Sequence, residues 1–386
     1  MNILFIDHSE HHSLNGGLDR VVCILSDFLK KNLGYTIYNA CAKYKNISNV
    51  DLILKDDEKA VIRLRQFLID KKIDVIANMR PAFYIQQIVE AKKGLSCKYI
   101  VQYHFTPYYM HKDAIPAFKR LIHHDIKIRP LKYGVKLLLY PLWTYVYYKR
   151  RMYYYKKNYN ASDKYVLLSD NFIDDFRKEV GLKDASKLVS IANPLSYSTY
   201  LPLEQLKEKE KEVLIVSRFV NNKRVDMSLK IWKFIEKERQ DWTLKLVGFG
   251  PEQENLEKLV KKLRLKNVVF VGKAEPFEFY KKASIFMSNS ALEGWMLTLT
   301  EAQQMGCVPI AMNSYKALPQ IIDSGKDGII IPNNNIKEFV NQLLYLMNNR
   351  EVRERMAVNG IESCKRFTID KIAAKWVELF EELKSN

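Results

Sequence analysis

Short apolar runs alternate with amphipathic segments along most of this chain. Runs such as Asn2–Ile6 and Val308–Met312 have the length of buried strands, and the segment from Leu18 to about Lys31 places its apolar side chains on one stripe, as a helix does. Strands of parallel sheets are buried on both faces, so they read as continuous Val-, Ile- and Leu-rich runs separated by helices. The alternation predicts an α/β fold with doubly wound parallel sheets.

A proline and a charged stretch divide this alternation into two halves. Ala192-Asn193-Pro194 is followed by LEQLKEKEKE (residues 203–212), and a length of 386 residues fits two domains. The strands expected in the first half are Asn2–Ile6, Thr36–Asn39, Asp74–Ala77, Lys98–Tyr103, Lys164–Leu168 and Leu188–Ile191. Those expected in the second half are Val213–Val216, Thr243–Val247, Val268–Val271, Ile285–Met287, Val308–Met312 and Gly328–Ile331. We predict two Rossmann-like domains, residues 1–194 and 195–368, with a hinge near residues 194–211. A C-terminal helix within residues 369–386 is expected to pack back toward the N-terminal domain.

Charge and cysteine content narrow the class of protein. The net charge is +18, and residues 119–159 hold eleven cations against one acid, Asp125. Charge concentrated in this way indicates an anionic partner, either phospholipid or nucleic acid. The five cysteines form no CxxC pair. The N-terminal MNILFID is typical of a first strand rather than a signal peptide. No window reaches about 18 uninterrupted apolar residues, the length that a transmembrane helix needs. We therefore expect a cytoplasmic protein without a disulfide framework, a structural zinc site or a transmembrane helix.

Two loops at expected strand ends have the features of phosphate sites, because ligands of such sheets bind beyond the carboxyl ends of the strands. Asn15-Gly16-Gly17 directly precedes a helix, whose free amides and positive end favour a phosphate. Arg218 and Lys223 lie in SRFVNNKR, between a strand and a helix, where two cations can neutralise a pyrophosphate. A plain loop-to-helix turn and two solvated surface cations are the structural alternatives.

A third loop combines two glutamates with a helix start. Glu293 and Glu301 lie in SALEGWMLTLTEA, between the strand expected at 285–287 and a helix. A carboxylate accepts bidentate hydrogen bonds from vicinal hydroxyls, so the pair can hold a ribose and a hexose, with free amides around Met296–Thr298 for a phosphate. Thr298 and Glu301 also fit a capping box, which is the structural explanation of Glu301.

Together these motifs resemble the glycosyltransferases of family 4, which have the GT-B fold and retain the anomeric configuration of the transferred sugar. The resemblance lies in SRFVNNKR, the turn Gly248-Phe249-Gly250-Pro251, the run EGWMLTLTEAQQMGCVPIA (residues 293–311) and Gly325-Lys326-Asp327-Gly328. Glu293 and Glu301 keep the family spacing of two glutamates with seven residues between them. The resemblance spans about residues 212–368. In the first half of the chain it rests on NGGLDR (residues 15–20) and His104.

The resemblance implies two Rossmann-like domains facing across a cleft and a role for each matching position. Glu301 would hold the ribose, Glu293 the transferred sugar, and His104 would lie over the reacting sugar. The residues implied for the diphosphate are Arg218 and Lys223, with the backbone of Gly16, Gly17, Met296 and Leu297. Those implied for the edge of the nucleobase are Lys273, Glu275 and Pro276. The family more often has Phe-Gly or Phe-Pro where Trp295-Met296 stands, which affects the seat of the sugar.

We therefore expect a retaining hexosyltransferase that moves a hexose from a nucleotide sugar, taken to be UDP-linked, to a lipid-linked or growing cell-surface glycan such as capsule or lipopolysaccharide. Paired cations and helix dipoles would stabilise the leaving diphosphate. The family implies a front-face substitution, in which the leaving phosphate deprotonates the acceptor and Glu293 is not the nucleophile.

Neither a metal nor another cofactor is expected. His8, His11 and His12 form an HxxHH pattern that lacks an accompanying HExxH or CxxC, and no DxD pair is present. Two alternatives stay open: a UDP-sugar 2-epimerase of the same fold, which needs no acceptor, and a basic nucleic-acid-binding protein, although no known nucleic-acid module is evident.

Residues 130–159 form a basic aromatic segment. It holds nine tyrosines and Trp143, and Leu137–Tyr148 contains no charge and is interrupted by Pro141, so it is too short to span a bilayer. Tyr and Trp favour the headgroup region, to which Lys and Arg can extend. We expect the segment to bind the inner face of the membrane through Lys149, Arg150, Arg151, Lys156 and Lys157, which makes the protein cytoplasmic and peripheral. The alternative is a helical insertion that packs its aromatics into the first domain.

Overall fold

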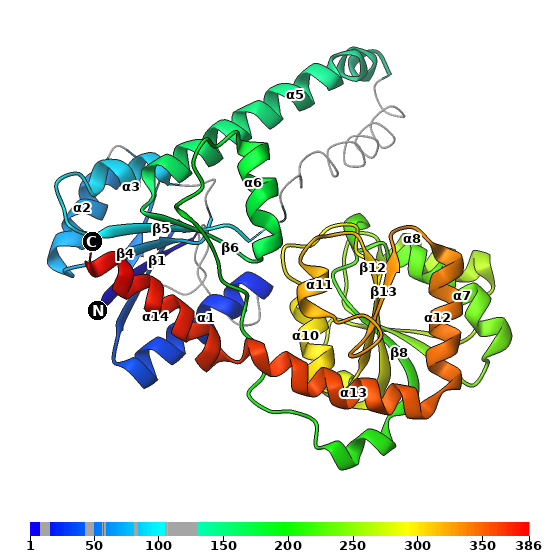
Figure 1. Cartoon of the computed structure of the whole chain (residues 1–386). Helices are drawn as coiled ribbons and strands as arrows, with labels where there is room; N and C mark the ends of the chain where they lie inside the picture. Colours follow the sequence, from blue (N-terminus) through cyan, green and yellow to red (C-terminus); the bar gives the residue numbers. More distant parts are fainter. Residues whose placement is uncertain are drawn as a thin grey trace. The chain divides into compact units, whose positions relative to one another are not determined.

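The computed structural model describes residues 1–7, 16–42, 50–55, 57, 59–80, 84–104, 106 and 130–385, with the backbone alone for 130–141, 143 and 144. The chain divides into two compact units, Met1–Pro194 with Ile369–Asn386, and Leu195–Thr368. Each unit has its own parallel sheet covered by helices (Figure 1), so the predicted fold class, two doubly wound Rossmann-like domains, is confirmed.

The first unit is built on a seven-stranded parallel sheet in the order β3-β2-β1-β4-β5-β6-β7. The strands are β1 (Asn2–Ile6), β2 (Thr36–Cys41), β3 (Leu52–Ile53), β4 (Val75–Asn78), β5 (Lys98–Gln102), β6 (Lys164–Leu167) and β7 (Leu188–Ser190). The helices are α1 (Gly17–Leu33), α2 (Ala60–Asp70), α3 (Ile85–Ala91), α5 (Pro130–Ala161), α6 (Ile173–Val180) and α14 (Ile369–Ser385). Figure 1 shows α1 and α14 on one face of the sheet and α2, α3 and α5 on the other.

The C-terminal helix α14 is part of the first unit. It buries one apolar stripe, which includes Trp376 and Phe380, and it packs against α1. Glu382 on this helix forms an ion pair with Lys164 at the start of β6, with 2.6 Å between the carboxylate oxygen and the ammonium nitrogen. The last residues of the chain therefore contribute to a domain whose other residues come before Leu195.

The second unit is built on a six-stranded parallel sheet in the order β10-β9-β8-β11-β12-β13. The strands are β8 (Glu210–Val216), β9 (Thr243–Val247), β10 (Val268–Gly272), β11 (Ala283–Ser288), β12 (Val308–Asn313) and β13 (Ile329–Pro332). The helices are α7 (Val225–Glu238), α8 (Gln253–Leu263), α9 (Phe277–Lys282), α10 (Leu297–Gln304), α11 (Leu318–Ile321), α12 (Ile336–Asn348) and α13 (Arg350–Cys364). Its core joins Trp232 and Trp242 to the apolar residues of the central strands.

Two details of the sequence expectations need correction. The units divide between Pro194 and Leu195, within the hinge range expected near 194–211, but the end of that range is too late because β8 already begins at Glu210. The charged start of this strand is accommodated by specific partners: Glu212 pairs with Lys245, and the Glu210 carbonyl accepts from Ser284 at 2.6 Å. Pro141 does not interrupt its segment either, because α5 is one helix of 32 residues.

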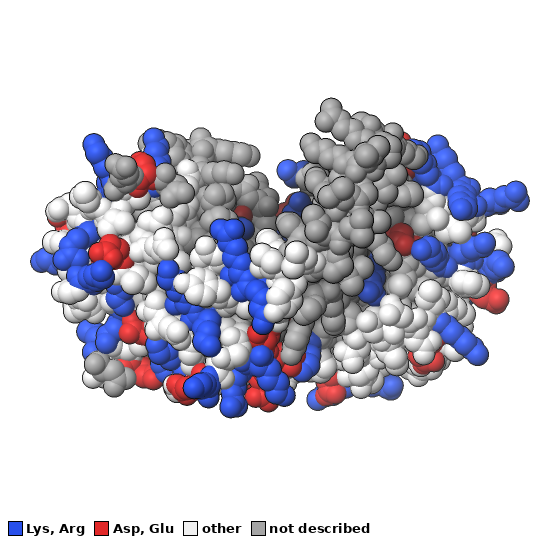
Figure 2. Space-filling view, turned by 90° about the horizontal axis from the view of Figure 1, so that it is seen from above, with Lys and Arg blue, Asp and Glu red and all other residues white. Residues whose placement is uncertain are grey.

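The surface carries the net charge of +18. On the face shown in Figure 2, Lys and Arg side chains are more numerous than Asp and Glu side chains. Among the described helices, none is both long enough and apolar enough to cross a membrane.

Candidate functional site

The carboxyl ends of the strands in the second sheet carry most of the predicted site residues. The loop after β8 holds Arg218 and continues into the short 3₁₀ helix η4 (Asn221–Lys223), and the loop after β11 holds Glu293 and leads into α10. Because β8 and β11 are adjacent parallel strands, both loops emerge at the same edge of the sheet. The fold thus brings together residues that are about 70 positions apart in the sequence.

Two glycines hold the loop of Arg218 against its neighbour. A Cβ on Gly248 would lie 1.8 Å from the Ser217 carbonyl oxygen, and one on Gly250 would lie 2.4 Å from the Phe219 carbonyl oxygen. The backbones approach this closely because the Phe219 amide donates to the Phe249 carbonyl at 2.9 Å, extending the β8–β9 pairing past the strand ends. The glycines of the GFGP turn are therefore required by the close approach of two loops.

The three cations of this loop differ in their partners. Arg218 is exposed, and its side chain has no hydrogen-bond or ion-pair partner among the residues that the structure describes. The Lys223 ammonium pairs with the Glu293 carboxylate, and these side chains are 23% and 13% exposed. Arg224 binds the side-chain oxygens of Asn333 and Asn334 at 3.1 and 3.0 Å. Arg218 and Lys223 thus remain at the edge of the sheet, whereas Arg224 is fixed to the loop after β13.

The start of α10 supplies amides to the same edge. Met296 is the N-cap and no side chain caps the helix, so the first amides, those of Leu297 and Thr298, lack an intrahelical acceptor. Met296 and Leu297 have buried side chains, and the Trp295 ring packs edge-on against Phe367 at a centroid distance of 4.9 Å. Packing therefore fixes the helix start, whose positive end favours an anion.

The structure rules out the capping box that the sequence allowed for Glu301. The helix begins one residue before Thr298 without a side-chain cap, and the Glu301 carboxylate instead accepts a hydrogen bond from the Tyr280 hydroxyl at 2.9 Å. Glu301 is 1% exposed. Burial, followed by the nearby Glu301 charge, raises the pKa of Tyr280 well above its usual value, so this phenol stays a donor.

The predicted nucleobase edge lies at the end of β10. The Lys273 ammonium lies 5.5 Å from the centroid of the Phe249 ring, and that ring is 50% exposed. Glu275 accepts a hydrogen bond from the Tyr197 hydroxyl at 3.1 Å, and Pro276 is the N-cap residue of α9. These residues form a rim beside the loop of Arg218, since Phe249 is also bonded to that loop.

The remaining predicted residues belong to the first unit. Gly16 has an extended backbone and directly precedes α1, whose first turn begins at Gly17. His104 follows β5 by two residues and is half-buried. His8, His11, His12 and Asn15 lie outside the described residues. Within the described part of the chain, no group of three or more His, Cys, Asp or Glu could hold a metal ion.

Sequence reasoning missed a charged pair at the carboxyl edge of the first sheet. Asp7, 1% exposed, directly follows β1 and pairs with Arg80, which follows β4. The sequence could have indicated Asp7, because an acid directly after an expected strand lies at the ligand-binding edge of the sheet. The sequence could not have indicated Arg80, because its partner Asp7 is more than 70 residues away.

The cations predicted for a membrane surface divide into exposed and packed ones. Lys149 and Arg150 are exposed, whereas Arg151 donates to the Tyr155 hydroxyl at 2.6 Å and is half-buried. The Lys156 ammonium reaches the Gly181 carbonyl at 3.1 Å, and Lys157 is half-buried.

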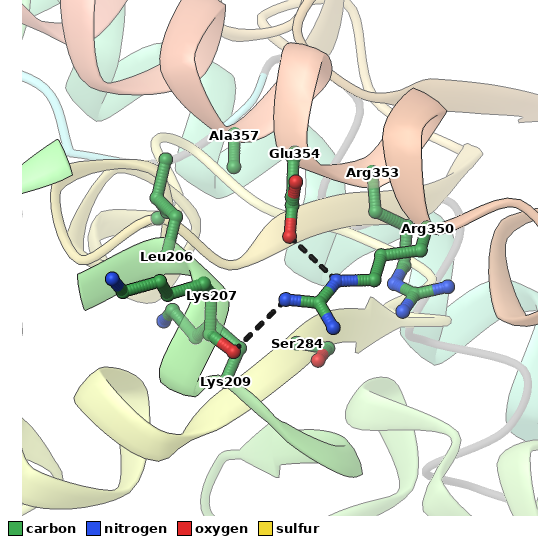
Figure 3. A pocket seen from close by; sticks show the side chains of 9 residues that line it. Leu206, Lys207, Lys209, Ser284, Arg350, Arg353, Glu354 and Ala357 are labelled. Carbon is green, nitrogen blue, oxygen red and sulfur yellow. Dashed lines mark hydrogen bonds and ion pairs between the residues drawn. The ribbon is translucent and has the colours of Figure 1, made fainter. Parts of the chain in front are cut away.

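A further pocket lies at the opposite edge of the second sheet. Figure 3 shows Lys207, Lys209, Arg350 and Arg353 around it, near Ser284 at the start of β11. The Lys209 ammonium bonds to the Tyr280 and Met305 carbonyls, and Arg350 bonds to Glu354 and the Lys207 carbonyl. Burial lowers the pKa of Lys209. Arg353 donates to the Leu346 and Met347 carbonyls, so three of these four cations bond to the protein's own groups, and we do not take this pocket as the candidate site.

Two doubly wound Rossmann-like units, with candidate ligand-binding residues at the carboxyl edges of their sheets, are the architecture of the GT-B glycosyltransferases. Residues 201–363 match the family model described as glycosyl transferases group 1. The matched stretch lies within the second unit, which is therefore the part of the chain that resembles this family.

Individual proteins resemble the chain over part or all of its length. An uncharacterized glycosyltransferase of Haemophilus influenzae is 34% identical over 194 residues, which are 50% of this chain and 54% of that protein. The chain thus spans about half the length of this curated relative. The pneumococcal O-GlcNAc transferase GtfA, solved with UDP and GlcNAc, superposes over 100% of this chain and 99% of its own with a TM-score of 0.74 at 12% identity. The lipopolysaccharide outer core galactosyltransferase WaaB superposes over 99% of this chain and 100% of its own, with a TM-score of 0.67 at 15% identity. At these identities the two structures show the fold alone.

Proposed function

We propose that this protein is a retaining hexosyltransferase that takes a hexose from a UDP-sugar and transfers it to a surface glycan or its lipid-linked precursor. One observation carries the proposal: the exposed Arg218 and the Lys223–Glu293 pair share one edge of the sheet with the uncapped start of α10. Cations and free amides suit a diphosphate, and the carboxylate beside them suits a sugar hydroxyl.

The donor would be held in three parts. Arg218 and Lys223 bind the diphosphate together with the amides of Met296 and Leu297, and Gly16 and Gly17 add the first turn of α1. Glu301, oriented by Tyr280, accepts from the ribose hydroxyls. The rim of Lys273, Glu275 and Pro276 borders the nucleobase, where the exposed Phe249 ring offers an apolar face.

The chemistry would be electrostatic. As the bond between the anomeric carbon and the leaving diphosphate breaks, negative charge grows on the phosphate oxygens, where Arg218, Lys223 and the α10 amides would supply positive charge. Glu293 orients the sugar and the leaving phosphate takes the acceptor's proton, which gives front-face substitution with retention. His104 contacts the reacting sugar or the acceptor, and no metal is required.

The acceptor would be a glycan at the membrane surface. WaaB is a lipopolysaccharide outer core galactosyltransferase of the same fold. A lipid-linked acceptor would bring the enzyme to the inner face of the membrane. The exposed Leu142, Tyr145 and Val146 lie next to the cations Lys149 and Arg150 on α5 and suit such a surface.

The proposal is tested by incubating the purified chain with UDP-glucose, UDP-galactose or UDP-GlcNAc and a membrane glycolipid extract. We expect a product heavier by one hexosyl residue in the mass spectrum, with the anomeric configuration of the donor by NMR. Release of UDP with a 2-epimeric free sugar and no acceptor would instead identify the 2-epimerase. A gel shift with RNA at about 0.15 M salt, without UDP-sugar turnover, would identify a nucleic-acid-binding protein.

A further inference from the structure

The loop after β12 brings a tyrosine to the same edge of the sheet as Glu293. Tyr315 lies between β12 and α11. Strands β11 and β12 are adjacent, with Ser288 paired to Ala311, so the loops that follow them are neighbours. The Ser314 hydroxyl donates to the Ser290 carbonyl and ties these two loops together. Tyr315 is thereby positioned beside the loop that carries Glu293.

The Tyr315 hydroxyl is buried, and among the described residues it has no hydrogen-bond partner. The residue is 5% exposed. Buried tyrosine hydroxyls normally have a partner, as Tyr280 has in Glu301 at 2.9 Å. The Tyr165 hydroxyl in β6 is unsatisfied too, but Tyr315 lies in a loop at the carboxyl edge of the sheet, where ligands of such folds bind, so its hydroxyl points to a group that a ligand brings.

The charges around Tyr315 indicate which ligand group its hydroxyl would bind. Burial and then the Glu293 carboxylate raise the pKa of Tyr315 well above its usual value, so the phenol keeps its proton and can donate. Glu293 is paired with Lys223, so beside the phenol there is an acceptor but no free cation, which suits a neutral hydroxyl better than a phosphate. Because a carboxylate only accepts and this phenol can donate, the two groups together complement neighbouring sugar hydroxyls.

We propose that Tyr315 is a specificity-determining residue of the sugar subsite, where its hydroxyl donates to one hydroxyl oxygen of the hexose while Glu293 accepts from a neighbouring one. This inference rests on the proposed function. A sugar whose hydroxyl at that carbon is missing or has the other configuration would leave the buried phenol unpaired, and such sites discriminate strongly.

The test is calorimetric titration of wild type and Tyr315→Phe with UDP, UDP-glucose, UDP-galactose and UDP-GlcNAc. We expect the variant to bind UDP as wild type does and to bind the preferred UDP-sugar about tenfold more weakly, with a smaller spread among the three sugars. Tyr345→Phe, on the exposed side of α12, is the matched control and should change none of these affinities.

Thermal unfolding without ligand separates this role from a structural one. Removing a hydroxyl that lacks a partner should leave the melting temperature of Tyr315→Phe equal to or above that of wild type. A lower melting temperature, an equal loss for UDP and UDP-sugar, or unchanged affinity for every ligand would overturn the inference. If wild type binds neither UDP nor any UDP-sugar, the proposed function itself fails. Normal UDP-sugar binding by both proteins removes only the role of Tyr315.

Discussion

Glu301 shows at the residue scale how the structure separates two explanations of one side chain. Its spacing from Thr298 fits a helix cap, and its spacing from Glu293 fits a pair of sugar-binding carboxylates. The structure places its carboxylate against the Tyr280 hydroxyl, away from a capping role. A carboxylate has about four lone-pair positions, so it can accept from Tyr280 and from ribose hydroxyls together.

We predict that Glu301→Gln weakens the binding of UDP and UDP-sugar alike, by about tenfold, because an amide replaces a charged acceptor of the ribose hydroxyls. Glu293→Gln should leave UDP binding near normal and impair turnover of the sugar donor, because that carboxylate addresses the hexose. Calorimetry with UDP and initial rates with UDP-sugar measure the two effects. Normal UDP binding by Glu301→Gln would contradict the assignment to ribose.

A second prediction at this scale concerns the cations. Arg218→Ala or Lys223→Ala should lower kcat/KM for the UDP-sugar by about 10²-fold or more, the scale of losing one preorganised contact to developing charge. Lys230→Ala on α7, which removes an exposed cation paired with Asp226, is the control and should keep the wild-type rate. Near-normal turnover by both single variants, with intact circular dichroism, would remove these residues from the diphosphate site.

Residue spacing could predict part of this site and could not predict the rest. Glu293 and Glu301 lie within one loop and helix, so their spacing is visible in the sequence. Tyr280 and Tyr315 come from other elements and reach the site only through the order of β11 and β12 in the sheet. A tyrosine carries no local mark of an unsatisfied hydroxyl, because that property depends on packing.

At the scale of one element, α5 has two faces with different environments. Met152, Tyr155 and Tyr159 follow helical spacing and are buried, and the Tyr155 ring packs on Tyr103 at a centroid distance of 5.1 Å. Leu142, Tyr145, Val146, Lys149 and Tyr153 share the other face and are exposed. The packing interpretation is confirmed for the buried face of α5, whereas membrane binding by the exposed aromatic and basic face stays a prediction.

The exposed face should bind anionic membranes. We predict that wild type sediments with vesicles containing phosphatidylglycerol, is released at about 1 M salt and binds neutral vesicles weakly, because anionic lipid adds about 1 kcal/mol per cation. Replacing Lys149, Arg150, Arg151, Lys156 and Lys157 by Ser should abolish binding, and Lys149→Ser with Arg150→Ser should account for most of the loss.

The control for this experiment is Lys71→Ser with Lys72→Ser, which removes the same charge from another exposed position in the first unit. It should sediment as wild type does. Equal binding to neutral vesicles, or equal losses in the control and in the double variant of α5, would defeat the membrane assignment.

Element boundaries also show where sequence patterns are insufficient. The expected start of β8 at Val213 follows from the first apolar residue, yet the strand begins at Glu210. Glu212 is buried, and it can occupy a strand because Lys245 on the neighbouring β9 neutralises it. A cross-strand pair of this kind is not visible until the strand order is known.

At the scale of the whole molecule, the chain leaves its first unit after Pro194 and returns to it at Ile369. The amphipathic stripe of α14 and the missing strand after it are visible in the sequence, whereas its neighbour α1 is set by the fold. The stability of the first unit therefore depends on residues that follow the second unit in the sequence.

We predict that deleting residues 369–386 unfolds the first unit and leaves the second folded. Burial of one large apolar side chain is worth about 1.5–3 kcal/mol, and α14 buries Ile372, Trp376, Leu379, Phe380 and Leu383. Their combined loss is comparable to the whole stability of a domain, about 5–15 kcal/mol.

Limited proteolysis followed by mass spectrometry should then yield a resistant fragment near 195–368, whereas wild type resists over both units. Deleting only 384–386, which follow the last buried side chain, should change nothing. A truncated chain that still protects residues 1–194 from cleavage would show that α14 is dispensable for the first unit.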